Sequence, residues 1–124
     1  MNSSHAFPPE LRLHFSWQYR AFFSGAAVLR LRECTIFRIP NDQGAFRLGI
    51  SIKSRGRSVD RNRVKRVIRE QFRLLRPELK SYDYNVLIPA QKKMAHPYPQ
   101  RLAECLKLEL PVALSEESRW NLIR

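Results

Sequence analysis

The residues best suited to chemistry stand in one short run, Arg61-Asn62-Arg63-Val64-Lys65-Arg66. Arginine guanidinium groups bind phosphate oxygens through two parallel hydrogen bonds, and a lysine ammonium group binds them as a point charge. From Lys53 to Arg76 the chain has ten Lys and Arg residues against the two acids Asp60 and Glu70, a net charge of +8. The other 100 residues hold only +4 of the total of +12. This concentration of charge indicates a binding surface for the phosphates of a polyanion.

The side chains needed for unaided catalysis are not gathered in the sequence. The 11 acids are scattered, whereas two-metal hydrolysis needs several carboxylates that converge on the metal ions. The histidines His5, His14 and His96 have no partner acid at a helical spacing, and no glycine-rich nucleotide-binding motif is present. Cys34 and Cys105 are far apart and form neither a CxxC pair nor a disulfide framework. We therefore expect a binding protein with no catalytic residue and no metal site of its own.

A helix from about Asp60 to Arg76 must position the basic residues, with Ser58 or Asp60 as its N-cap and Pro77 preventing its continuation. At 100° per residue the apolar residues share one side: Val64, Val67, Ile68, Leu74 and Leu75, with Phe72 at the boundary. The polar and basic residues share an adjoining arc of about 140°: Arg61, Asn62, Lys65, Arg66, Arg69, Arg73 and Arg76. This pattern predicts a helix with its apolar side on a sheet and its basic side outward.

The rest of the chain predicts a mixed α and β protein. A short helix is expected over 17–23, strands over 34–39 and 46–52 joined as a hairpin by the turn at 40–44, and an interior strand over 82–88. A last core-facing helix is expected over 100–110, whereas the signal for further helix in 111–124 is weak, which favours fraying.

One face of the second strand carries Arg47, Gly49 and Ser51, while the alternate residues are apolar. Together with Tyr19 and Phe37, these residues could form a surface on which unpaired bases stack.

Length and composition favour a single domain over residues 1–124. The chain has no apolar run long enough to span a bilayer, and Met1 to His5 is polar, unlike a secretory signal. We therefore expect a soluble intracellular, cytoplasmic protein without a membrane partner.

The run Ser58 to Glu70 with its Arg-Asn-Arg opening resembles the protein subunit of bacterial ribonuclease P. The resemblance extends over about residues 6–110, which leaves 111–124 as a C-terminal extension. It is carried by four further segments in the same order, namely 6–13, 19–23, 47–51 and 82–88.

The resemblance implies an α+β fold of the α/β sandwich type, like the second domain of ribosomal protein S5. A four-stranded mixed sheet would pack with helices in the order α-β-β-β-α-β-α, with a left-handed βαβ crossover through the basic helix. The general handedness rule alone would instead predict a right-handed crossover.

The function implied by the resemblance is assistance to a catalytic RNA, which removes the 5′ leader of precursor tRNA with Mg²⁺ held mainly by the RNA and the substrate. No metal would be bound by the protein alone, and no obligate protein partner is implied. The residues implied to contact the catalytic RNA are Arg61, Asn62, Arg63, Lys65, Arg66, Arg69, Arg73, Lys53 and Arg55. The residues implied to line the cleft for the single-stranded leader are Tyr19, Phe37, Arg47 and Ser51.

Charge alone leaves other functions open. A ribosomal or general nucleic-acid-binding protein without a role in tRNA processing would use the same cationic helix for rRNA or DNA. A stand-alone ribonuclease and a membrane-surface helix are weaker alternatives, because the chain lacks an acid constellation and the apolar side of the helix is needed for the core.

Overall fold

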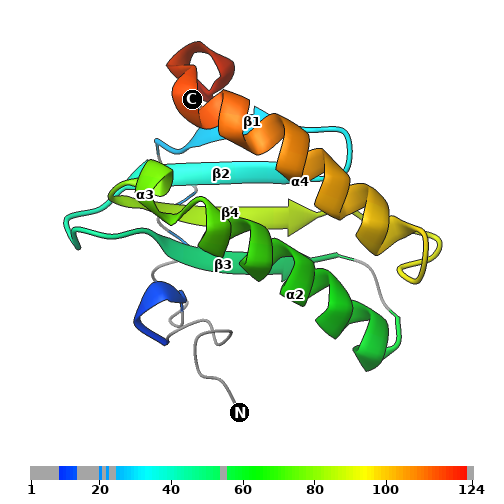
Figure 1. The fold of residues 1–124 in the computed structure, drawn as a ribbon. Coiled ribbons are helices and arrows are strands. Elements are labelled where there is room, and N and C mark those ends of the chain that lie inside the picture. The colour runs from blue at the N-terminus through cyan, green and yellow to red at the C-terminus, as the bar shows by residue number, and fades with distance from the viewer. Residues whose placement is uncertain (1–8, 14–19, 21, 23–24, 54–55, 123–124) are drawn as a thin grey trace.

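The computed structural model describes residues 9–13, 20, 22, 25–53 and 56–122, and within them a sheet with two long helices on one face (Figure 1). The elements are η2 (Pro9–Leu11), β1 (Ala27–Arg30), β2 (Thr35–Pro40), β3 (Arg47–Ile52), α2 (Ser58–Leu74), α3 (Arg76–Leu79), β4 (Tyr82–Ile88), α4 (Tyr98–Ser115), η4 (Glu117–Arg119) and β5 (Asn121–Leu122). The helix predicted over 17–23 lies largely outside the described residues, as do Tyr19 and Arg55.

The strand order across the sheet is β3-β4-β2-β1-β5. Strand β4 lies between β2 and β3, antiparallel to β2 and parallel to β3. The predicted hairpin at 40–44 is therefore wrong, because the two strands that this turn connects are not neighbours. Each of them pairs along its whole length with β4, a strand more than 30 residues further along the chain.

The parallel pair β3 and β4 requires a crossover, and α2 supplies it. Figure 1 shows both strands pointing to the right, with β3 below β4 and α2 in front of the sheet. Because both strands point to the right and the helix lies in front, a chain that passes from the lower strand to the upper strand makes a left-handed crossover. The structure thus has the unusual crossover that the resemblance implied, against the general rule for such units.

Helix α2 differs from its prediction at both ends. It begins at Ser58, its N-cap is Arg57, and no side chain caps it, so Ser58 and Asp60 lie inside the first turn. It ends at Leu74, and Pro77 lies in the first turn of α3 rather than after the end of α2. Leu74 was predicted on the apolar side, but its side chain is 58% exposed because the helix ends there.

The C-terminal extension is ordered over 111–122, which corrects the prediction that it frays. Helix α4 continues through Pro111 to Ser115, and β5 adds a fifth strand beside Ala27 and Val28 of β1. The prediction of four strands missed β5, which has only two residues and so no alternating pattern.

An aromatic cluster holds this extension on the sheet. The buried guanidinium group of Arg38 lies 4.0 Å from the centre of the Trp120 ring and 4.3 Å from that of Tyr82, and it forms an ion pair with Glu117. The indole Nε1 of Trp120 donates a hydrogen bond of 2.9 Å to the carbonyl oxygen of Ala113. Trp120 and Glu117 of the extension thus pack against a buried cation of the sheet.

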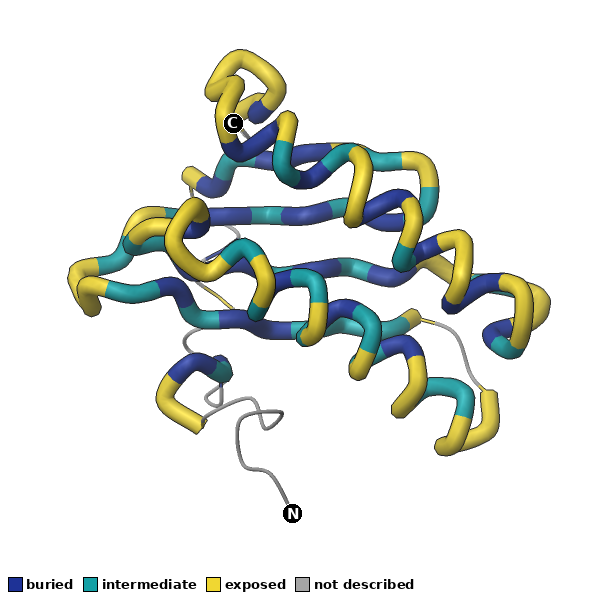
Figure 2. The backbone as a smooth tube through the Cα atoms, in the orientation of Figure 1, coloured by how far each residue is buried: buried dark blue, intermediate teal, exposed yellow. Residues whose placement is uncertain are grey.

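The main core contains buried residues of both long helices and of the sheet, whereas a smaller cluster packs against Phe37 and Ile39, which point to the other face of β2. Figure 2 shows buried positions recurring along both long helices. From α2 the main core receives Val64, Ile68 and Phe72, all fully buried. Tyr84 of β4 packs there with its hydroxyl donating a 2.8 Å hydrogen bond to the carbonyl oxygen of Leu79, and burial raises its pKa to about 12. The smaller cluster consists of Leu13, Phe22 and Ala26, with Phe37 and Ile39 packed against it.

Replacing Trp120 by Ala should lower the free energy of unfolding by about 3 kcal/mol, because a buried ring, its hydrogen bond and its contact with Arg38 are all lost. Leu122→Ala is the matched control, since Leu122 belongs to the same extension and is 71% exposed. Leu122→Ala should lower the free energy of unfolding by less than about 0.5 kcal/mol. Urea denaturation of the full chain measures both, and equal losses would show that Trp120 does not anchor the extension.

Candidate nucleic-acid interface

The basic side of α2 faces away from the sheet because three turns of the helix are fixed by buried apolar residues. Asn62, Arg63 and Arg66 are exposed, and at 100° per residue they fall on the side of the helix opposite Val64, Ile68 and Phe72. Lys65 and Arg69 lie on one flank of the helix and are half-buried. Arg61 is also half-buried, in the first turn on the side of the core contacts, with its Nε buried. We call the predicted RNA contacts from Arg61 to Arg69 the α2 ridge: Arg61, Asn62, Arg63, Lys65, Arg66 and Arg69.

Arg73 was predicted to belong to the same binding set, but it forms an ion pair within the helix. Its Nη2 donates to Oε2 of Glu70 at 2.7 Å and its Nε donates to Oε1 at 3.3 Å. The hydrogen bond with Glu70 raises the pKa of Arg73. The positive charge of α2 is thus concentrated toward its N-terminal half, where Asp60 is the only acid between Arg57 and Arg69.

Lys53 follows β3 directly and is exposed, beside the end of β4. Its backbone N–H donates to the carbonyl oxygen of Ile88 at 3.0 Å. Lys53 therefore lies at the end of the sheet where α2 begins.

The sheet face opposite α2 and α4, here called the second sheet face, brings together the predicted leader contacts other than Tyr19. In the strand register, Arg47 of β3 lies opposite Asp83 of β4, and Gly49 lies opposite Asn85. On its other side, Asn85 lies opposite Phe37 of β2. Directly paired residues point to the same face of a sheet, so Phe37, Arg47 and Ser51 share this surface. Phe37 is half-buried because its ring packs against the smaller cluster.

Arg47 is held by a carboxylate that sequence reasoning missed. Its Nε and Nη2 donate to the two carboxylate oxygens of Asp83 at 2.8 and 2.7 Å, and Asn41 Nδ2 donates to the same carboxylate at 2.7 Å. The hydrogen bond with Asp83 raises the pKa of Arg47. The charge of Arg47 is thus compensated, and its guanidinium plane is fixed on the sheet face.

Two polar residues of β4, Asp83 and Asn85, belong to this surface. The hydroxyl of Ser51 donates to Oδ1 of Asn85 at 3.3 Å. Their signal in the sequence was the alternation of Asp83 and Asn85 with Tyr82, Tyr84 and Val86, which marks a strand with one polar face.

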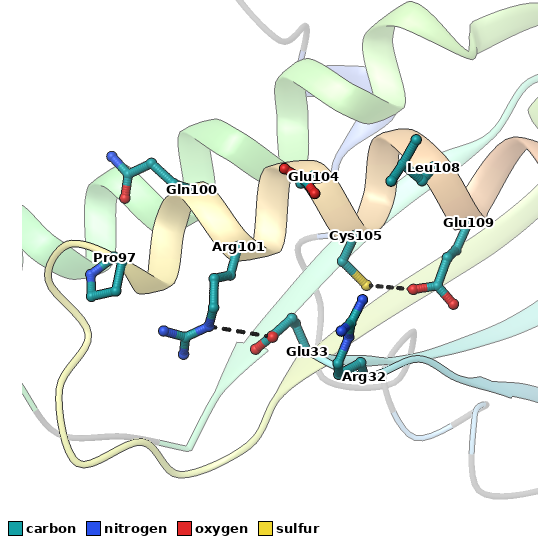
Figure 3. Close-up of a pocket in the computed structure, with 9 residues that line it drawn as sticks. All are labelled: Arg32, Glu33, Pro97, Gln100, Arg101, Glu104, Cys105, Leu108 and Glu109. Atoms are coloured by element: carbon teal, nitrogen blue, oxygen red, sulfur yellow. Dashed lines mark hydrogen bonds and ion pairs between the residues drawn. The ribbon is translucent and has the colours of Figure 1, made fainter.

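A pocket of about 640 Å³ lies between α4 and the loop after β1, away from both surfaces (Figure 3). Its charged residues pair with one another: Arg101 Nε lies 3.3 Å from Oε2 of Glu33, and the thiol of Cys105 donates to Glu109. Burial is the main cause that raises the pKa of Cys105. With Glu104 also in its lining, this pocket has no excess of positive charge for phosphates.

In the part of the chain that the structure describes, no three His, Cys, Asp or Glu side chains are grouped to hold a metal ion. Over the same residues, no helix has both the length and the hydropathy needed to cross a membrane.

Comparisons with known proteins agree on one family. The sequence model of the family described as ribonuclease P matches residues 7–110. A ribonuclease P protein component from an Exiguobacterium species is 35% identical over 79 residues, which are 63% of this chain and 69% of that protein.

Solved structures give the same result. The ribonuclease P protein of Thermotoga maritima, in complex with 1-(4-fluorophenyl)-2-thiourea, superposes with a TM-score of 0.68 and 25% identity over 85% of this chain and 98% of that chain. The ribonuclease P protein of Staphylococcus aureus gives a TM-score of 0.65 and 25% identity over 87% and 92% of the two chains.

Asp83→Asn should destabilise the protein by about 3 kcal/mol, because it leaves Arg47, whose side chain is 17% exposed, without its partner charge. Glu70→Gln is a matched control that breaks the exposed pair with Arg73 and should cost less than about 0.5 kcal/mol. Chemical denaturation gives both values. A loss for Asp83→Asn no larger than for Glu70→Gln would mean that the Arg47 pair does not stabilise the sheet face.

Proposed function

Since the chain belongs to the ribonuclease P protein family and is a component of the holoenzyme that processes tRNA 5′ ends, we propose that it binds two separate stretches of RNA. The α2 ridge binds the catalytic RNA, and the second sheet face binds the single-stranded 5′ leader of precursor tRNA. The ribosomal and general nucleic-acid-binding alternatives lack the support that the family match gives to tRNA processing.

The observation that carries the first part is the exposure of Asn62, Arg63 and Arg66 on a helix whose opposite side is buried. Like charges four residues apart on a helix repel each other, and Asp60 and Glu70 are too few to offset them. Phosphates of an RNA backbone would relieve this repulsion and release the counterions that otherwise accompany the RNA.

Support for the second part comes from the shape and chemistry of the second sheet face. Two of the five N–H groups of Arg47 are fixed by Asp83, so its other donors have a defined direction in which to meet a nucleotide. Phe37 supplies a partly exposed ring for base stacking, and Ser51 and Asn85 supply polar groups beside it. We propose Tyr19 as a second stacking residue of this surface.

Catalysis in this proposal belongs to the RNA subunit. The Mg²⁺ ions would be held mainly by that RNA and by the substrate, and the protein would act by neutralising and positioning RNA. We propose a cytoplasmic location, with no membrane partner and no obligate protein partner.

The proposed function is tested by reconstitution with bacterial ribonuclease P RNA and a precursor tRNA. Added protein should lower the Mg²⁺ concentration needed for leader removal, because its cations replace part of the screening by metal ions. It should also tighten the binding of precursor tRNA more than that of mature tRNA, which lacks the leader. Protein without added RNA is the control and should leave the precursor intact; an unchanged Mg²⁺ requirement would refute the assignment.

Arg63→Ala combined with Arg66→Ala should weaken binding to the catalytic RNA and make the log–log salt dependence shallower by about 1–2 units, as expected when two phosphate contacts are lost. Arg73→Ala on the same helix is the comparison, and it should change the slope less because Glu70 already binds Arg73. Filter binding over a range of salt concentrations measures the slopes. A slope unaltered by the double substitution would place the phosphates elsewhere.

A further inference from the structure

The C-terminal ends of β3 and β4 lie side by side, at the end of the sheet where both long helices start (Figure 1). Ile52 pairs with Ile88, and the backbone N–H of Lys53 continues the ladder to the carbonyl oxygen of Ile88. The loop after β3 leads into α2 and the loop after β4 leads into α4. The parallel pairing therefore brings two loops and two helix N-termini to one end of the molecule.

The loop after β4 is basic and is fixed beside the start of α2. From Pro89 to Ala103 the sequence contains no acid, while Lys92 and Lys93 are exposed. The next residue, Met94, is buried in the main core. A Cβ atom placed on Gly56, two residues before α2, would lie 3.8 Å from Met94 Cγ. Gly56 therefore lies near Met94, which places the two lysines near the start of α2.

The charge at this end is strongly positive. The exposed cations are Lys53 and Arg57 from the loop before α2, and Lys92 and Lys93 from the loop before α4. Nearby acids offset them only in part, because Glu33 is engaged by Arg101 at 3.3 Å and Asp60 carries a single charge. Both helices begin at this end, so the positive ends of both helix dipoles lie here, and neither helix has a side chain that caps its first turn.

We propose that Lys92 and Lys93 bind phosphates of the catalytic RNA, as a second contact beside the start of the helix that carries the α2 ridge. The inference rests on the proposed function, because it needs the α2 ridge to face that RNA. The same phosphate chemistry is available from precursor tRNA, but continuity with the ridge favours the catalytic RNA. An anchored loop loses little conformational entropy on binding, which favours a real contribution to affinity.

The test is Lys92→Ala combined with Lys93→Ala in the full-length protein, with affinity for ribonuclease P RNA measured from low to high salt. The expected result is weaker binding and a log–log salt slope shallower by about 1–2 units, as for the loss of two phosphate contacts. The matched control is Lys80→Ala combined with Arg76→Ala, which removes the same charge from exposed residues. Arg76 follows the end of α2 and Lys80 precedes β4, so both lie at the opposite end of the molecule.

The outcomes separate this inference from the function on which it rests. A shallower slope for the lysine pair but not for the control supports the second contact. If both double substitutions change the slope equally, only overall charge matters and the inference is overturned. If the lysine pair has no effect while Arg63→Ala with Arg66→Ala does, the inference fails and the proposed function stands. A loss confined to precursor tRNA binding would also overturn it, because the contact would then be to the substrate.

Discussion

Val64, Ile68 and Phe72 lie one turn apart on α2 and are fully buried against the sheet. Burial of such side chains contributes roughly 1.5–3 kcal/mol each, whereas repulsion between like charges on a helix costs a few tenths of a kcal/mol per pair. The apolar contact therefore outweighs the repulsion, and the helix can carry a dense set of cations without detaching from the core. Because these buried residues fix the rotation of α2 about its own axis, they also determine which of the cations are exposed to solvent.

Strand β4 has the second organising role. By separating β2 from β3 and running parallel to β3, it makes α2 a crossover helix and directs both helix starts to one end of the sheet. The same strand supplies Asp83 and Asn85 to the second sheet face. One strand thus links the surface that carries the exposed cations of α2 to a surface on which Arg47 is paired with Asp83.

Periodicity predicted the features that depend on local sequence: the basic helix, the strands around residues 34–39, 46–52 and 82–88, and the shared face of Arg47 and Ser51. Features that depend on distant partners were missed. Nothing near the turn at 40–44 reveals that β4 inserts between its flanking strands, and the pairing of Arg47 with Asp83 follows only from that insertion. The extension was missed for the same reason, since Trp120 has its partners in Arg38 and Tyr84 rather than in its neighbours. The left-handed crossover came from family resemblance, because no local pattern encodes handedness.

The two flanks of the sheet share a property that bears on how the protein behaves before it meets RNA. At one edge of the sheet, the backbone N–H of Leu13 donates a hydrogen bond to the carbonyl oxygen of Leu48 in β3. At the other edge, the two-residue strand β5 pairs with part of β1. Exposed strand edges are templates for pairing with another chain, and short or covered edges suppress this. A highly charged chain that must persist until a large RNA is available is thereby protected from edge-to-edge aggregation with its own copies.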